Sequence, residues 1–118
     1  MCGCSPVPRC RRQELVPEDV RRAADVLERR YAVSIIYASH HGCTRFTEFR
    51  HALGTIPPAT LAQRLGELER AGVLRREVRD TRPPHVEYLL TPEGRRLEGL
   101  LAALAAWARA EVRPSSVS

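Results

Sequence analysis

The fold is decided by the stretch IPPATLAQRLGELERAGVLRREVRDTRPPHVEYLLTPEG, residues 56–94. Its first third predicts a helix over residues 57–71, because Pro57 and Pro58 suit the first turn of a helix and Ala71-Gly72 suits its end. Within it, Leu61, Leu65 and Leu68 recur at i, i+4 and i+7. That spacing gives the helix one apolar face, to be buried, and one polar face directed outward.

A hairpin and a terminal helix are expected after it. Residues 73–79 and 85–90 follow the period of two typical of strands, and residues 80–84 contain the two prolines of the hairpin tip. Residues 91–93, Thr-Pro-Glu, predict the start of the terminal helix by a capping side chain, a proline and an acid. This helix carries an apolar stripe longer than a short domain can cover, made of Leu97, Leu100, Leu101, Leu104 and Trp107.

Three shorter helices are expected before the deciding stretch. The first begins at Pro17, which two acids follow, and its apolar spacing continues to Tyr31. The second covers the nearly uncharged residues 33–40 and is predicted to be buried on most sides. The third begins with Thr47 as its cap and ends at Gly54.

The charge of the chain points to a polyanionic partner. Its 118 residues suit a single domain, and its net charge of +5 comes from 19 arginines, with no lysine, against 14 acids. Residues 45–82 hold 8 arginines and 5 acids, a net +3, whereas residues 83–118 hold 4 of each. Guanidinium groups suit phosphates and base edges, so the middle of the chain is the expected contact surface.

The sequence also excludes several classes of protein, because their motifs and long apolar segments are missing from it. The sequence has no nucleophile elbow, phosphate-binding loop or paired-carboxylate pattern, so no enzyme and no cofactor are expected. The uncharged run of the terminal segment, residues 99–108, and the longest run without Asp, Glu or Arg, residues 31–44, are both well short of the roughly 20 residues of a membrane span, so we expect a cytoplasmic protein without membrane contact. We divide the chain into a flexible basic arm (1–16), one domain (17–112) and a disordered tail (113–118).

Four segments carry a resemblance to a known family: residues 42–49, 56–68, 72–76 and, above all, PPHVEYLLTPEG at 83–94. In these segments the chain resembles the HxlR-type transcriptional regulators, relatives of the MarR group, over about Val20 to Trp107. The resemblance implies a mainly α protein with a small β-hairpin wing, a winged helix-turn-helix. It also implies a homodimeric DNA-binding regulator, usually a repressor, whose dimer interface is formed by the first and terminal helices through Val20, Leu27, Leu97, Leu100, Leu101, Leu104 and Trp107.

Double-stranded operator DNA is the expected partner. Residues 57–71 would enter the major groove, where the outward Thr60 and Gln63 suit base edges, and the wing, residues 79–85, would lie on the flanking minor groove or backbone. The full set of expected DNA contacts is Arg45, Thr55, Pro58, Ala59, Thr60, Gln63, Arg64, Arg75, Arg76, Arg79, Arg82 and His85. The family commonly has a capping Ser where this chain has Pro57 and a basic residue where it has Ala59. This weaker recognition helix leaves a second reading open, a winged-helix module that binds a protein.

The cysteines leave a sensing role open. Cys2, Cys4 and Cys10 lie beside arginines, which lower the pKa of neighbouring thiols and raise their reactivity, so a metal- or redox-sensing arm is one hypothesis. Their spacing differs from the usual structural zinc pattern, so we predict no metal site. Cys43 is the fourth candidate sensor, although a lone cysteine beside Phe46 is more often a small core residue. A small-molecule or redox effector therefore stays open.

Overall fold

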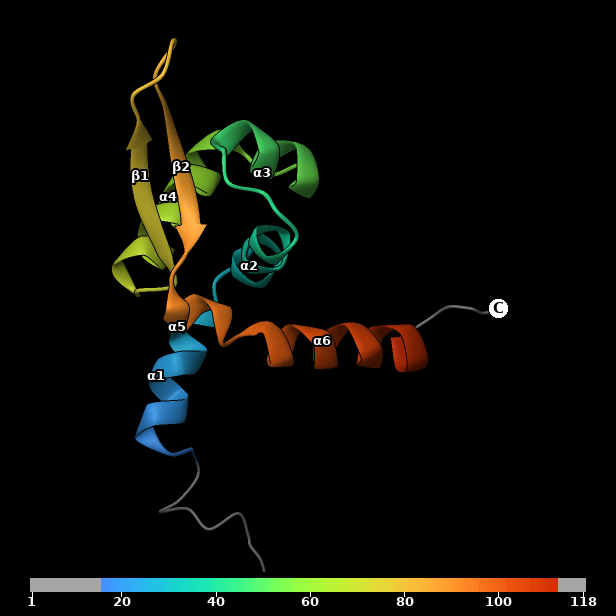
Figure 1. Ribbon diagram of the computed structural model, residues 1–118. Coiled ribbons are helices and arrows are strands. Elements are labelled where there is room, and N and C mark those ends of the chain that lie inside the picture. The colour runs from blue at the N-terminus through green and yellow to red at the C-terminus, as the bar shows by residue number, and fades with distance from the viewer. Residues whose placement is uncertain (1–15, 113–118) are drawn as a thin grey trace, which may run out of the picture.

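The computed structural model describes residues 16–112 and has the mainly helical, winged architecture that the sequence predicts (Figure 1). The expected tail and all but Val16 of the expected arm lie outside the described residues. In chain order the elements are α1 (Glu18–Leu27), α2 (Ala32–His40), α3 (Phe46–Leu53), α4 (Pro58–Arg70), β1 (Leu74–Arg79), β2 (His85–Leu90), α5 (Pro92–Arg95), α6 (Glu98–Trp107) and the π-helical turn η2 (Ala108–Val112).

The core lies where α2, α3 and α4 meet the base of the hairpin. Ile35 and Ile36 of α2, Phe49 of α3 and the stripe of α4 are fully or almost fully buried there. Burial of one such side chain contributes roughly 1.5–3 kcal/mol, so this cluster is what holds α3 and α4 at a fixed angle. The predictions that residues 33–40 form a buried helix and that the leucine stripe faces inward are confirmed.

The wing is an antiparallel hairpin whose register places Leu74 opposite Leu90, Glu77 opposite Glu87 and Arg79 opposite His85. Near its base Leu74 is buried, and the backbone amide of Tyr88 donates a hydrogen bond of 2.7 Å to the carbonyl of Thr44. This bond ties β2 to the loop before α3. Farther out the hairpin extends past the helices, so its distal half is solvated on both faces (Figure 1).

The first helix is shorter than predicted, because α1 ends at Leu27 and Tyr31 belongs to the start of α2. Tyr31 has a φ of 77°, a left-handed conformation that no helix interior accommodates. The third helix begins at Phe46, not after Thr47. The reason is Glu48, whose side chain accepts the backbone N–H groups of Thr44 (2.9 Å) and Arg45 (3.1 Å) and so fixes Arg45 as the N-cap.

The prediction of one long terminal helix is wrong: the structure has the short α5 and then α6, with a turn between them. The hydroxyl of Thr91 accepts a hydrogen bond of 2.9 Å from the amide of Gly94 and donates one to the carbonyl oxygen of Gly72. These two bonds fix α5 against the turn between α4 and β1. Arg96 and Leu97 then make i→i+3 backbone bonds that tighten the chain. The tightened turn redirects the chain before α6 begins.

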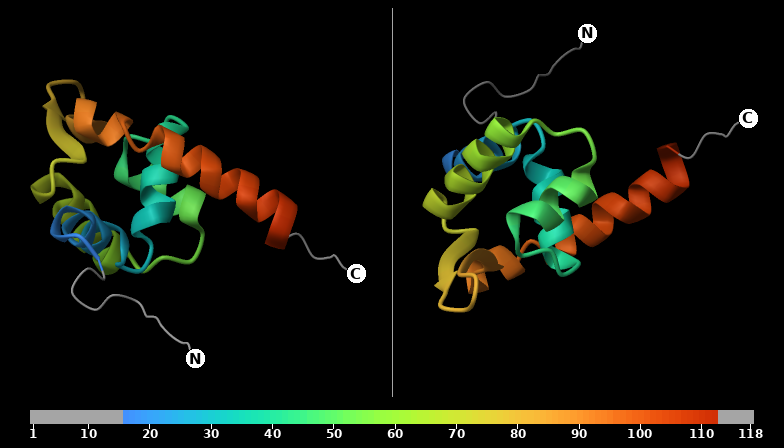
Figure 2. Two further views of the ribbon diagram at one scale, coloured as in Figure 1. Left: turned by 90° about the horizontal axis from the view of Figure 1, so that it is seen from below. Right: turned by 90° about the horizontal axis from the view of Figure 1, so that it is seen from above.

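Two helices leave the body of the domain in different directions. Figure 1 shows α1 extending away from the end that carries the wing tip, and Figure 2 shows α6 running outward as a rod. No residue of α1 is buried, and α6 buries only Leu101. Leu100, Leu104 and Trp107 stay 50%, 43% and 58% exposed, so most of the apolar stripe of α6 has no cover within residues 16–112. No helix among these residues is long and apolar enough to cross a membrane.

Candidate nucleic-acid interface

Helices α3 and α4 form a helix-turn-helix unit. A short turn joins them, with Gly54 at a φ of 76° and Ile56 almost fully buried beneath the turn. The N-cap of α4 is Pro57, which makes no side-chain capping bond, so the first-turn amides are open to water or to a phosphate oxygen. On this outward end Ala59 and Gln63 are exposed and Thr60 is half-buried, as expected for side chains that approach base edges.

The other members of the expected DNA-contact set are of two kinds: side chains that are accessible to a ligand, and side chains that bond to other groups of the protein. Thr55, Pro58 and Arg45 are exposed around the turn and the start of α3, and Arg76 and Arg82 are exposed on the wing. Gln63 is exposed but donates a hydrogen bond to Glu67 at 3.3 Å. The accessible groups lie on α3, α4 and the wing, which share one end of the molecule (Figure 1).

Arg64 lies apart from that surface. Its Nε donates to the carbonyl oxygen of Arg30 at 2.9 Å, and its Nη1 lies 3.5 Å from a carboxylate oxygen of Glu67. Only 15% of its side chain is exposed. The sequence placed Arg64 among the DNA contacts, but the structure directs its guanidinium toward the link between α1 and α2, where it fastens α4 to that link.

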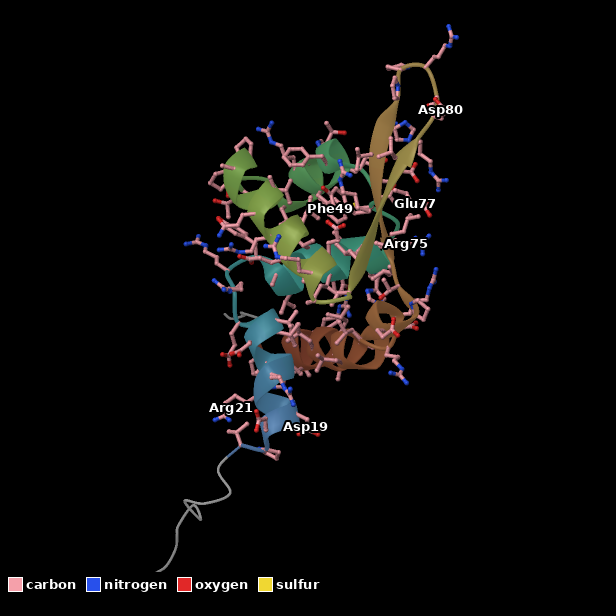
Figure 3. All side chains as sticks on the ribbon, turned by 90° about the vertical axis from the view of Figure 1, so that its left-hand side faces the viewer. Asp19, Arg21, Phe49, Arg75, Glu77 and Asp80 are labelled. Atoms are coloured by element: carbon pink, nitrogen blue, oxygen red, sulfur yellow. The ribbon has the colours of Figure 1, made fainter. Side chains whose placement is uncertain are left out.

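Arg75, Arg79 and His85 are bound by acids. Arg75 lies 2.9 Å from Glu77, and Arg79 lies 3.1 Å from Glu77 and 2.9 Å from Glu87. Hydrogen bonds from His85 and Arg79 lower the pKa of Glu87, and the bond to Glu87 raises the pKa of Arg79. Figure 3 shows Arg75, Glu77 and Asp80 following one another along the wing. Sequence reasoning did not place Glu77 and Glu87 among the site residues, although pairing the two predicted strands across the tip, residues 80–84, would have set them opposite each other.

Cys43 is half-buried and packs against the core. Burial, with a smaller contribution from Glu48, raises the pKa of its thiol, which lowers the fraction of reactive thiolate. It lines an open cavity of about 550 Å³ between α2, α3 and α6, together with Tyr37, His41 and Leu104. Cys2, Cys4 and Cys10 lie outside the described residues. Within residues 16–112 no three His, Cys, Asp or Glu side chains come together as metal ligands.

An α3–turn–α4 unit with an exposed helix start, next to a hairpin whose tip carries the exposed Arg82, defines a winged helix-turn-helix DNA-binding protein. The protein belongs to the HxlR-like helix-turn-helix family, which it matches over residues 26–116. It is 35% identical over 94 residues to the uncharacterized HTH-type transcriptional regulator YvaP of Bacillus subtilis, covering 80% of this chain and 87% of that one.

Solved structures agree with this assignment. The oxidized form of the redox regulator HypR superposes with a TM-score of 0.75 at 34% identity, covering 82% of this chain and 99% of that one. The reduced form of the transcriptional regulator YodB from B. subtilis gives a TM-score of 0.74 at 30% identity, covering 86% and 99%. The chain is thus an HTH-type transcriptional regulator, and its relatives are regulators and not enzymes.

Proposed function

We propose that the protein is a homodimeric repressor that binds a palindromic operator in double-stranded DNA. The first turns of α4 would read base edges in the major groove through Thr60 and Gln63, and Arg82 at the wing tip would contact the flanking minor groove or backbone. Accessible Arg45 and Arg76 would bind phosphates. As a regulator of genomic DNA, the protein would act in the cytoplasm.

The observation that best supports this proposal is the separation of two surfaces. The accessible groups of the expected DNA-contact set lie at the end with α3, α4 and the wing tip, whereas the large exposed apolar side chains, apart from Val78 of β1, lie at α1 and on α6 (Figure 1). A twofold axis through an isologous α1 and α6 interface would cover the exposed leucines and Trp107. The same axis would present two recognition helices to successive turns of one face of a duplex.

The proposed dimer and its operator binding are tested together. We expect a dimer mass in solution and a shift of the protein's own upstream DNA that needs an inverted repeat with half-sites about 10 bp apart. If six to ten phosphates are contacted, affinity should fall roughly 10³–10⁵-fold between 50 and 200 mM salt. A monomer that ignores every duplex at low salt would refute the proposal and would favour a protein-binding module.

Arg82→Glu tests the wing, with Arg95→Glu on α5 as the matched control for the same change of charge. We expect the Arg82 variant to lose most of its operator affinity while its thermal unfolding stays unchanged, because Arg82 is exposed at the hairpin tip. The operator affinity of the Arg95 variant should be much closer to that of the wild-type protein. Equal affinities of the Arg82 variant and the wild-type protein would remove the wing from the contact surface.

A further inference from the structure

The outer face of the wing carries a continuous network of charged side chains. From the base outward, Arg75 pairs with Glu77 (2.9 Å) and Glu77 pairs with Arg79 (3.1 Å). Arg79 also pairs with Glu87 (2.9 Å), and Glu87 pairs with His85 (3.0 Å). Every group has at least one oppositely charged or hydrogen-bonding neighbour, and the two carboxylates each hold two.

The register of the hairpin explains why this network forms. Glu77 and Glu87 are directly opposite each other, an arrangement in which two carboxylates repel. Arg79 bridges them, because its Nη1 contacts one carboxylate and its Nε contacts the other. The guanidinium therefore has two of its donor directions occupied by acids, and turning it toward a phosphate would separate two charge-assisted hydrogen bonds and leave the carboxylates facing each other.

The tip of the same hairpin is different. Arg82 is exposed, and within residues 16–112 it makes no ion pair. Arg79 is the last residue of β1 and precedes Arg82 by three positions, so both lie in the part of the wing that would approach DNA. The two arginines therefore do not differ by their position on the wing. They differ because Glu77 and Glu87 hold Arg79, whereas no acid holds Arg82 within residues 16–112.

We propose that Glu77 and Glu87 are specificity residues, which hold Arg75 and Arg79 off the phosphate backbone so that the wing contacts duplex DNA through its tip. This inference rests on the DNA binding proposed above. Non-specific affinity comes almost entirely from neutralised phosphates, whereas operator affinity also comes from base contacts on α4. Arginines held by acids therefore weaken binding to an arbitrary duplex and preserve the preference for the operator.

The test uses the full chain with the double change Glu77→Gln/Glu87→Gln, and two duplexes of equal length, the operator and its scrambled sequence. Each released arginine that gains a phosphate adds about 0.9 to the slope of log affinity against log salt. We expect a slope steeper by up to about 1.8 per protomer and a scrambled-duplex affinity that rises more than operator affinity does. The ratio of the two affinities should fall by about tenfold or more.

The matched control is Glu28→Gln/Glu93→Gln, which removes the same two charges from exposed residues that lie outside the wing and make no ion pair within the described part of the chain. It should leave the affinity ratio unchanged. In a second control, Arg75→Gln and Arg79→Gln are added to the Glu77/Glu87 variant, which restores the wild-type net charge. The slope and the ratio should then return to their wild-type values, because the released guanidinium groups are gone.

Each outcome decides between the proposals. If the Glu77/Glu87 variant and its Glu28/Glu93 control behave alike, net charge explains the effect and the inference is wrong. If the variant binds with an unchanged slope, the arginines gain no phosphate and the inference is wrong as well. Should the double variant fail to fold, Glu87→Gln alone, which leaves Arg79 one partner, gives a smaller change of the same sign. A wild-type protein that binds no duplex at low salt would instead refute the proposed function, and this inference with it.

Discussion

Replacing Arg64 by methionine tests whether this arginine stabilises the fold or binds DNA. Methionine keeps the aliphatic stem of the side chain but removes the donor that reaches the Arg30 carbonyl at 2.9 Å. A hydrogen bond from a charged donor contributes about 1.5–3 kcal/mol, and we take the lower end because the carbonyl is open to water. The weaker pair with Glu67 adds about 0.3–0.5 kcal/mol. The expected loss of unfolding free energy is therefore roughly 2 kcal/mol.

Two measurements on the same variant test this reasoning. Urea unfolding at a fixed protein concentration reports the stability, and operator binding over a range of salt reports the number of phosphates contacted. Arg64→Met should lower the unfolding midpoint and leave the salt slope unchanged. Arg82→Met, the control, should leave the midpoint unchanged and reduce the slope by about 0.9 per protomer.

The opposite pattern would refute the structural role of Arg64. If Arg64→Met unfolds at the wild-type urea concentration but loses salt dependence, its guanidinium binds a phosphate in the complex, as the sequence alone suggested. A third readout concerns α1. Because Arg64 fastens α4 to the link after α1, its loss should also broaden the range of half-site spacings that the protein tolerates.

Three further predictions follow from individual contacts. Gly94→Ala should cost about 3 kcal/mol, because its Cβ would overlap the Val73 carbonyl oxygen, whereas Gly99→Ala, with open space around it, should stabilise the protein by up to about 1 kcal/mol; calorimetry of both tests the difference. Backbone hydrogen bonds lower the pKa of Glu48, so its stabilisation is present above the unfolded-state value of about 4.3 and disappears as the pH falls through the folded-state value. Glu48→Gln should therefore weaken the protein at pH 7 and make little difference near pH 2, as urea midpoints against pH would show. Trp107→Glu should leave the protomer folded but convert the proposed dimer to a monomer, and a dimer mass for this variant would contradict the α6 interface.

The local features of the fold could be predicted from the sequence. The spacing of Leu61, Leu65 and Leu68 established α4 and its buried face, and alternation with a proline-rich turn established the hairpin. The sequence also identified the start of α4 as lacking a capping side chain and placed Arg82 at the hairpin tip. All of these depend on neighbours within a few residues, which is the range over which helix and strand periods and turn preferences act.

The remaining features depend on contacts between distant parts of the chain. Thr91 bonds to Gly72, and this contact across 19 positions helps to divide the terminal segment into α5 and α6. The direction of α6 then decides that Leu101 enters the core while Leu100 and Leu104 stay exposed, although all three belong to one apolar stripe. A stripe shows which side chains avoid water, but it does not show which of two apolar surfaces will cover each of them.

The same division holds for charge. The sequence by itself determined that the protein is an arginine-rich winged helix with a basic middle, because composition and period are properties of the chain. Only the tertiary structure decided which arginines are held, since Arg64 finds its carbonyl 34 positions away and Arg79 finds Glu87 across the hairpin. A guanidinium group binds whichever oxygen lies within about 3 Å, and that distance is set by the packing of elements that the sequence order keeps apart.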